Sequence, residues 1–303
     1  MTRKPSVSGQ FYPDAPEDLR KLIIACFFHP LGPGSLDGPP ELHEHEGDPS
    51  DSPPDHGNLS AVIVPHAGIS ISGPCAAWSY RAIIEAGGFD TYVLLGPNHT
   101  GMGRTGISQE DFETPFGKAE TDKTLCATLL KDGVILESDE AHMFEHSLEV
   151  QLPFLQVIHH DVLRTPFSIV PMVVSDLNDA DRMADVLRQM ITESDKRICL
   201  ICSTDFTHHG HPYGYVPFTK DVQEKIKELD MGAIEHILKL DSKGFSGYVE
   251  KTGATICGRM PIALLLTTIA DGRATLLKYF TSADIIGDRE NSVSYASIAF
   301  YRG

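Results

Sequence analysis

Three short runs of aliphatic residues recur along the chain with the same ending. Residues 61–64, 92–95 and 198–202 are apolar, and each run is followed by a turn-forming or polar segment that contains a histidine. Apolar runs of this length, bounded by residues that break regular structure, predict strands buried on both faces. The stretches 168–174, 274–281 and 292–301 also read as strands, and the alternation in the last two predicts an antiparallel pair.

Segments with apolar residues at helical spacing separate these runs. The pattern predicts one helix that follows 14–17 and ends at Pro30, one over 142–160 kinked at Pro153, and one over 219–240 broken near Gly232. Residues 104–116 read as loop-like, with a short segment at 106–108 and a turn at 114–117, and 134–136 as a short strand. The remaining predicted helices cover 72–85, 121–130, 179–191, 241–250 and 260–269. Strands that alternate with helices predict an α/β protein with three layers, α/β/α, and a mostly parallel central sheet.

One stretch departs from this pattern. Residues 31–60 are rich in Gly, Pro, Asp, Glu and His and contain no Lys or Arg. Such a composition buries too little apolar surface to offset the loss of chain entropy. We therefore expect an acidic surface insertion on a single domain that spans 1–303, and we interpret His43, His45 and His56 as solvated loop residues.

Charge and cysteine content narrow the classes of function. The 303 residues include 25 Lys and Arg against 42 Asp and Glu, a net charge of -17, which argues against nucleic acid and anionic membranes as partners. The sequence shows neither a spanning apolar run nor a secretory leader, so we expect a cytoplasmic protein with reduced cysteines. Cys199 and Cys202 lie inside an apolar run, which favours buried small residues over a metal or redox motif.

The histidines that follow the predicted strands are candidate metal ligands. His66 and His99 follow what we expect to be neighbouring parallel strands, and His208 follows a third. Neutral imidazole is the commonest metal ligand among side chains, so His66 and His99 can converge on one ion. Several side chains are candidates for a third ligand: Cys257, Asp205, His208, His146 and Glu149.

Each of these residues also has an ordinary structural interpretation. A histidine after a strand is commonly a satisfied loop or core residue, and Cys257 fits a buried small residue. Asp205 can cap the segment that follows it, and Glu149 can pair with His146 on a helix surface. Recurrence at three strand exits raises a metal site to a serious alternative, and the pattern alone leaves both interpretations open.

Seven motifs, in order along nearly the whole chain, resemble the Memo family, whose prokaryotic members are called AmmeMemoRadiSam system protein B. They are 8–13 (SGQFYP), 64–68 (VPHAG), 95–99 (LGPNH), 145–153 (EHSLEVQLP), 203–208 (STDFTH), 256–261 (ICGRMP) and 292–296 (SVSYA). The resemblance implies a fold similar to that of class III extradiol dioxygenases, which are non-haem iron enzymes.

The resemblance also implies a site. By motif, His66, His99 and Cys257 would be the metal ligands, and Asp205, His208 and His146 would be the catalytic residues of the pocket. Many of the dioxygenases carry a carboxylate where Cys257 stands. A thiolate is softer and accepts copper or zinc as well as Fe(II), so ring cleavage does not transfer with the fold.

Three functions follow as hypotheses. The first is a metal-dependent redox protein that uses Fe(II) or copper, in which His208 or His146 would shuttle protons and Asp205 would orient an imidazole. The second is a non-catalytic module in which the same cleft, with Arg259, binds a peptide or small anion. The third is a zinc hydrolase. The system name further implies AMMECR-type and radical-SAM proteins as partners.

Overall fold

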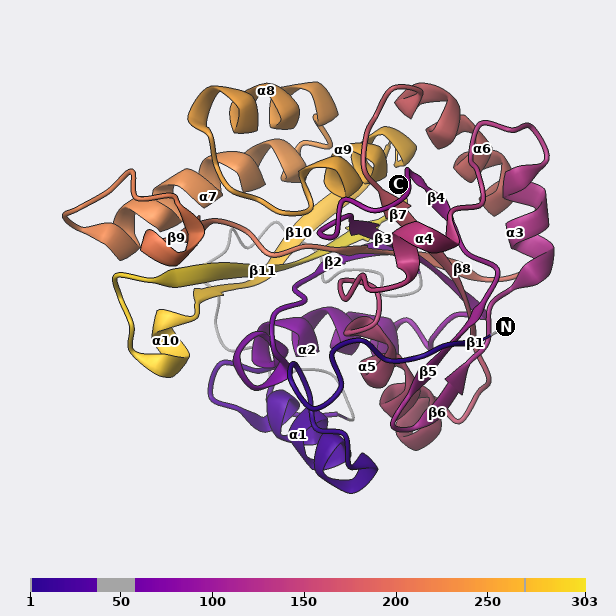
Figure 1. Ribbon diagram of the computed structural model, residues 1–303, viewed down its shortest axis with the longest axis horizontal. Helices are drawn as coiled ribbons and strands as arrows, with labels where there is room; N and C mark the ends of the chain where they lie inside the picture. The colour runs from indigo at the N-terminus through magenta and orange to yellow at the C-terminus, as the bar shows by residue number, and fades with distance from the viewer. Residues whose placement is uncertain (1, 37–57, 270) are drawn as a thin grey trace.

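A central sheet lies between two layers of helices in the computed structural model, which describes residues 2–36, 58–269 and 271–303 (Figure 1). The strand order is β10-β11-β2-β8-β3-β7-β4, and β9 pairs with β11. The four strands β2, β8, β3 and β7 are parallel, while β10, β11 and β4 join antiparallel at the two edges. The strands are β2 (Leu59–Val64), β3 (Thr91–Pro97), β4 (Gly106–Ile107), β7 (Ser168–Val174), β8 (Ile198–Ser203), β9 (His208–His209), β10 (Arg273–Thr281) and β11 (Ser292–Tyr301).

The apolar runs of the sequence form the buried centre of this sheet. Every residue of β2, β3 and β8 is buried, as expected for strands covered on both faces. The predicted antiparallel pair is also confirmed, because β10 and β11 pair from Arg273↔Tyr301 to Thr281↔Ser294.

Helices cover both faces of the sheet, which confirms the α/β class and the three layers (Figure 1). One apolar cluster lies under α3, α6, α7, α8 and α9, and a second lies under α1, α2 and α5. The helices are α1 (Pro16–Phe28), α2 (Ile69–Glu85), α3 (Lys123–Leu130), α4 (Asp139–His142), α5 (Gln151–Val157), α6 (Ala180–Glu193), α7 (Val222–Leu238), α8 (Ser242–Thr252), α9 (Arg259–Thr268) and α10 (Ala283–Ile286), with a π-helix at Ile158–Leu163 and a 3-10 turn at His211–Tyr213.

The loop-like segment over 104–116 is more regular than predicted, although the short element at 106–108 and the turn at 114–117 are confirmed. It contributes β4 and β5 (Asp111–Thr114), and β5 joins β1 (Thr2–Arg3) and β6 (Gly117–Ala119) in a small second sheet. The strand predicted at 134–136 is wrong, since only an isolated bridge between Ile107 and Glu137 forms nearby.

The single helix predicted over 142–160 is wrong. Helix α4 ends at His142, residues 143–150 turn, and α5 begins only at Gln151. Polar side chains compete with the helical backbone in the turn, because Glu145 Oε1 accepts a hydrogen bond from Ser147 N at 2.8 Å. Pro153 lies in the first turn of α5, where proline is tolerated.

The break predicted near Gly232 is also wrong, because α7 is continuous. A side chain at Gly232 would lie 2.2 Å from the hydroxyl oxygen of Tyr248 on α8. The glycine therefore allows two helices to pack closely rather than ending one of them.

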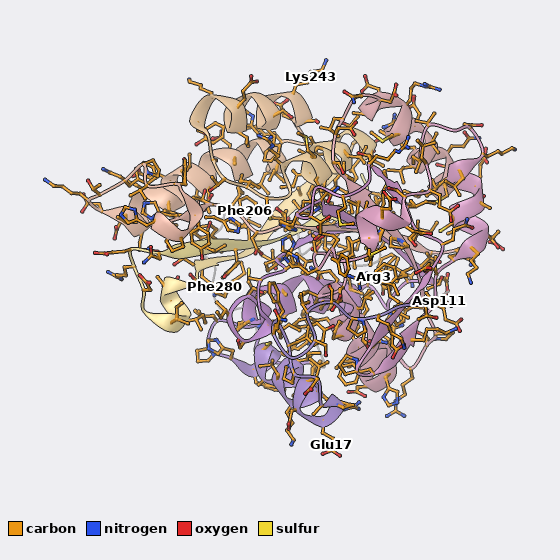
Figure 2. The ribbon with its side chains drawn as sticks, in the orientation of Figure 1. Arg3, Glu17, Asp111, Phe206, Lys243 and Phe280 are labelled. Carbon is orange, nitrogen blue, oxygen red and sulfur yellow. The ribbon has the colours of Figure 1, made fainter. Side chains whose placement is uncertain are left out.

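Most of the predicted insertion over 31–60 lies outside the described residues, as do His43, His45 and His56. Among the helices of the described residues, none has the length and apolar character needed to cross a membrane. Figure 2 shows Lys243 of α8 and Glu17 of α1 at opposite margins of the molecule, with Phe206 and Arg3 between them.

Candidate metal centre

The candidate site lies at the edge where the parallel strands end. His66 follows β2 and His99 follows β3. The sequence predicted that these two strands are neighbours, and this prediction is wrong. Strand β8 lies between them, with Val64 opposite Ser203 and Leu95 opposite Cys202. The two rings nevertheless meet, with centroids 5.1 Å apart. The carboxyl edge of the sheet thus gathers histidines from strands on either side of β8.

The tautomer of His66 is fixed by its surroundings. Ser203 Oγ donates its one proton to Ser147 O at 2.6 Å, so it accepts from His66 Nδ1 at 2.9 Å. The lone pair of the ring is therefore on Nε2, which lies 3.3 Å from Cys257 Sγ. A ring held in this way has its free nitrogen directed at the thiol, as a metal ligand requires.

His99 is held in the same tautomer by a carboxylate. Glu145 accepts hydrogen bonds from His99 N at 2.6 Å and from His99 Nδ1 at 2.8 Å, which leaves Nε2 of His99 with a lone pair. Burial alone would raise the pKa of Glu145, but the hydrogen bond from His99 and further donors lower it to about 2. Sequence reasoning missed Glu145, and its position directly before His146 was the available signal.

Cys257 occupies a tight turn before α9. Its sulfur accepts a hydrogen bond from Asp205 N at 3.2 Å and lies 3.8 Å from Thr204 Oγ1. Burial, and then the carboxylate of Asp205, raise the pKa of the thiol well above its ordinary value. The thiol is therefore protonated unless a cation replaces its proton.

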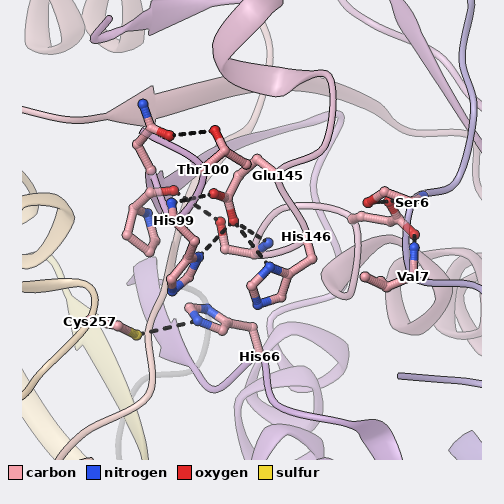
Figure 3. A network of polar contacts seen from close by, with 12 residues as sticks. Ser6, Val7, His66, His99, Thr100, Glu145, His146 and Cys257 are labelled. Atoms are coloured by element: carbon pink, nitrogen blue, oxygen red, sulfur yellow. Dashed lines mark hydrogen bonds and ion pairs between the residues drawn. The ribbon is translucent and has the colours of Figure 1, made fainter. Parts of the chain in front are cut away.

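The donor atoms of His66, His99 and Cys257 all lie within 4.8 Å of one another (Figure 3). The atoms of His99, Glu145 and His146 meet the same limit. The carboxylate oxygens of Glu145, however, already accept hydrogen bonds from backbone and imidazole N–H groups, as the dashed lines in Figure 3 show. The set with two Nε2 lone pairs and one sulfur therefore fits a transition metal better.

His146 lies against this group. Its ring stacks on that of His99 with centroids 4.5 Å apart and stands 5.4 Å from that of His66. Burial and the neighbouring histidine lower the pKa of His146 to about 4, and burial with three nearby histidines lowers the pKa of His66. Both rings are neutral at neutral pH, the form in which imidazole binds metals.

Asp205 and His208 also lie close to the site, and the partners of Asp205 differ from the expectation. Asp205 Oδ1 accepts from the backbone N–H groups of His66 at 2.8 Å and Ala67 at 3.3 Å, so it holds the main chain rather than an imidazole. Burial raises the pKa of this carboxyl. His208 Nδ1 donates to the carbonyl oxygens of Phe206 and Thr255, which places its lone pair on Nε2.

Glu149, a candidate third ligand in the sequence, belongs to another network. It is buried, and its two oxygens accept five hydrogen bonds from the N-terminal segment, from Arg3, Ser6, Val7 and Tyr12. The expectation of a surface pair between Glu149 and His146 is therefore wrong. Arg259, which we expected in the cleft, is an exposed residue at the start of α9.

Comparisons with known proteins agree with these motifs. The family described as Memo-like protein matches residues 3–299. A MEMO1 family protein of Methanopyrus kandleri is 38% identical over 309 residues, covering 100% of both chains, and one of Methanosarcina mazei is 37% identical over 98% of both.

A solved structure, that of an uncharacterized protein from Escherichia coli K12, superposes with a TM-score of 0.52 at 14% identity, covering 81% of this chain and 100% of its own. This likeness supports the α/β fold alone. The two sequence comparisons extend over almost the whole chain and include the segments that carry His66, His99 and Cys257. The chain therefore belongs to the Memo-like protein family.

Proposed function

We propose that the protein is a metal-dependent redox protein in which His66, His99 and Cys257 hold Fe(II) or copper. The observation that carries this proposal is the fixed tautomer of the two histidines. Ser203 and Glu145 accept hydrogen bonds from the two Nδ1–H groups, so both Nε2 atoms keep their lone pairs near the sulfur. Partners of this kind fix the orientation and tautomer of metal-ligating histidines.

The donor set favours these two metals. One thiolate with two imidazoles suits Fe(II), copper and zinc, and disfavours magnesium and calcium, which prefer oxygen ligands. Three protein ligands leave coordination positions for a substrate or oxidant, and the bound metal would supply electron transfer or Lewis acidity there.

The surrounding side chains take roles set by their hydrogen bonds. His146 is neutral and half-buried beside the ligands, so it can accept a proton from a bound substrate. His208 can do the same through Nε2, because its Nδ1 proton is already donated to backbone carbonyls. Asp205 positions residues 66 and 67 and the sulfur through main-chain hydrogen bonds.

Metal analysis of protein purified without oxygen tests the proposal. We expect about one iron or copper per chain, lost in His66→Ala, in His99→Ala and in Cys257→Ser. His160→Ala serves as the matched control, because that ring is 77% exposed on the surface. Unchanged metal content in the site variants would reject the site.

The other two hypotheses predict different results. Zinc in stoichiometric amount, with iron and copper absent, would favour the hydrolase. Protein that stays free of metal after anaerobic reconstitution, yet binds an anionic peptide, would favour the binding module.

The family resemblance leads us to propose AMMECR-type and radical-SAM proteins as partners. Co-purification of the three proteins after joint expression tests this, with the isolated chain as control. A chain that elutes alone at micromolar concentrations of all three would contradict a direct complex.

A further inference from the structure

One buried side chain bridges the strand exit that carries His66 and the hydrogen-bond partner of its ring. Gln151 is the first residue of α5 and is 0% exposed. Its Nε2 donates to Pro65 O at 3.0 Å and to Ser203 Oγ at 2.8 Å. Pro65 directly precedes His66, and Ser203 Oγ accepts from His66 Nδ1. One amide group therefore holds both the main chain before His66 and the hydroxyl that contacts its ring.

The orientation of this amide is fixed by its partners. A carbonyl oxygen can only accept, so the atom that faces Pro65 O is Nε2. On the other side of the amide, the hydroxyl of Tyr80, from α2, donates to Gln151 Oε1 at 2.6 Å. Both hydrogens on Nε2 are thus used, and Oε1 has a donor. A buried amide with all of these hydrogen bonds satisfied specifies a single arrangement of the groups around it.

The amide also completes the hydrogen bonds of Ser203. A hydroxyl has one proton to donate and two lone pairs that accept. Ser203 Oγ donates to Ser147 O and accepts from His66 Nδ1 and Gln151 Nε2, so all three positions are occupied. Without the donor from Gln151, one lone pair of the hydroxyl is empty. The hydroxyl then holds the imidazole less firmly.

We propose that Gln151 is a positioning residue for the metal centre, which acts on His66 through Pro65 O and Ser203 Oγ and does not contact the metal. This role rests on the proposed function, because the orientation of the ring matters for binding only if His66 is a ligand. Side chains that hold ligating histidines contribute about 10–100-fold to metal affinity. Gln151 acts through Ser203, so we expect an effect of about tenfold, at the lower end of this range.

Proton exchange at His66 Nδ1 in the metal-free protein tests the role directly. In protein labelled with nitrogen-15 at histidine, the resonance that is missing from His66→Ala identifies this N–H group. Gln151→Met keeps the approximate volume of the side chain and removes the amide. We expect the Nδ1–H group to exchange with water about tenfold faster in this variant, because the contacts that protect it open more often.

Competition for Zn²⁺ with a chelator of known affinity gives the second readout, since zinc has no redox chemistry and accepts imidazole and thiolate ligands. Gln151→Met should bind Zn²⁺ about tenfold more weakly than the unsubstituted protein. Gln156→Met is the matched control, because Gln156 lies on the same helix and its amide bonds Thr114 and Gly117 instead of the site. The control should leave both readouts unchanged.

Tyr80→Phe provides a second variant. It keeps the ring that stacks on Phe154, with centroids 4.7 Å apart, and removes only the hydroxyl that orients the amide. Both readouts should change in the same direction as in Gln151→Met, by a smaller factor. If Gln151→Met does not fold, as judged by its thermal transition, Tyr80→Phe decides alone, and unchanged readouts in it would overturn the proposal.

Equal effects of Gln151→Met and Gln156→Met on proton exchange and on zinc affinity would also overturn the positioning role. Unsubstituted protein that binds no Zn²⁺ would instead reject the metal site. The exchange measurement needs no metal, so faster exchange in Gln151→Met would then still support the hold of Gln151 on His66. The failure of the proposed function and the failure of this inference are therefore distinguishable.

Discussion

At the scale of single residues, the site is defined by where protons lie. Ser203 and Glu145 each accept a hydrogen bond from an Nδ1–H group, so His66 and His99 present Nε2 to the sulfur. Ser203 and Glu145 can affect metal binding without contacting the metal, because the hydrogen-bond partners of ligating histidines fix the orientation of the ring and raise its basicity. Two buried glutamates four residues apart, Glu145 and Glu149, make this claim testable.

Replacing Glu145 with Gln should weaken metal binding about 10–100-fold, because an uncharged amide is a poorer acceptor for His99 Nδ1–H. Glu149→Gln is the matched control, since Glu149 serves the N-terminal segment and not a histidine of the site. Competition with a chelator of known affinity measures both. Equal losses in the two variants would show that the Glu145 effect is one of general folding.

Glu149 should make the free energy of unfolding depend on pH. Burial alone would raise its pKa, but Arg3 and the hydrogen bonds from Tyr12 and Ser6 hold it below the ordinary value of 4.5. A lowered pKa in the folded state stabilises the fold above pH 4.5, and this contribution is lost as the pH falls toward the folded-state pKa.

Glu149→Gln should therefore cost about 3–5 kcal/mol at pH 7, because Arg3 loses its buried partner. The difference from the unsubstituted protein should shrink at pH 3.5. Urea denaturation at both pH values measures it, and a difference that stays constant with pH would refute the linkage.

Residues of the candidate site could be predicted from the sequence only where they lie in a motif. The strand exits and the resemblance indicated His66, His99, Cys257, His146 and the pair Asp205 and His208. They could not show which of two glutamates in one segment faces the site, because that depends on how 143–150 turns. For the same reason, the sequence predicted that Asp205 orients an imidazole, whereas its carboxylate accepts hydrogen bonds from backbone N–H groups.

At the scale of elements, a close contact positions the cysteine. A Cβ at Gly258 would lie 2.3 Å from Thr204 Cβ and 3.1 Å from Ser203 O, so only glycine lets α9 start against the end of β8. This contact fixes Cys257, one residue earlier, relative to the strand that carries Ser203.

Gly258→Ala should thus weaken metal binding at least tenfold and destabilise the fold by about 1–3 kcal/mol, because the turn must move. Gly247→Ala in α8 is the matched control, since a Cβ there meets nothing within 4 Å. It should stabilise the protein by about 0.5–1 kcal/mol, as alanine does in a helix. Metal titration and thermal unfolding report both effects, and normal metal affinity in Gly258→Ala would disprove the positioning role.

Periodicity predicted most strands and helices and failed where tertiary contacts override it. The apolar runs located β2, β3, β8 and the β10–β11 pair, because burial on both faces leaves a clear pattern. It could not show that β8 lies between β2 and β3, since strand order is a property of the whole sheet. The segment 142–160 has helical spacing, but the turn over 143–150, where Glu145 accepts from Ser147 N, interrupts it.

At the scale of the whole molecule, thiol accessibility separates the site from the core. Of the six cysteines only Cys257 is partly exposed, and the other five are buried. Alkylation of the folded, metal-free protein should therefore modify Cys257 before the other five, at a rate slowed by the raised pKa of its thiol, while unfolded protein should react at all six. Bound metal should protect Cys257, and mass mapping reads each position. Modification of Cys199 or Cys202 before unfolding would contradict the core described above.

The most direct test of the account is X-ray absorption at the metal edge of protein purified without oxygen. The account predicts iron or copper with one sulfur neighbour at about 2.3 Å and two imidazole nitrogens at about 2.0–2.1 Å, by analogy with the known distances at zinc. The sulfur signal should be lost in Cys257→Ser. A metal with only oxygen and nitrogen neighbours in the unsubstituted protein would contradict it.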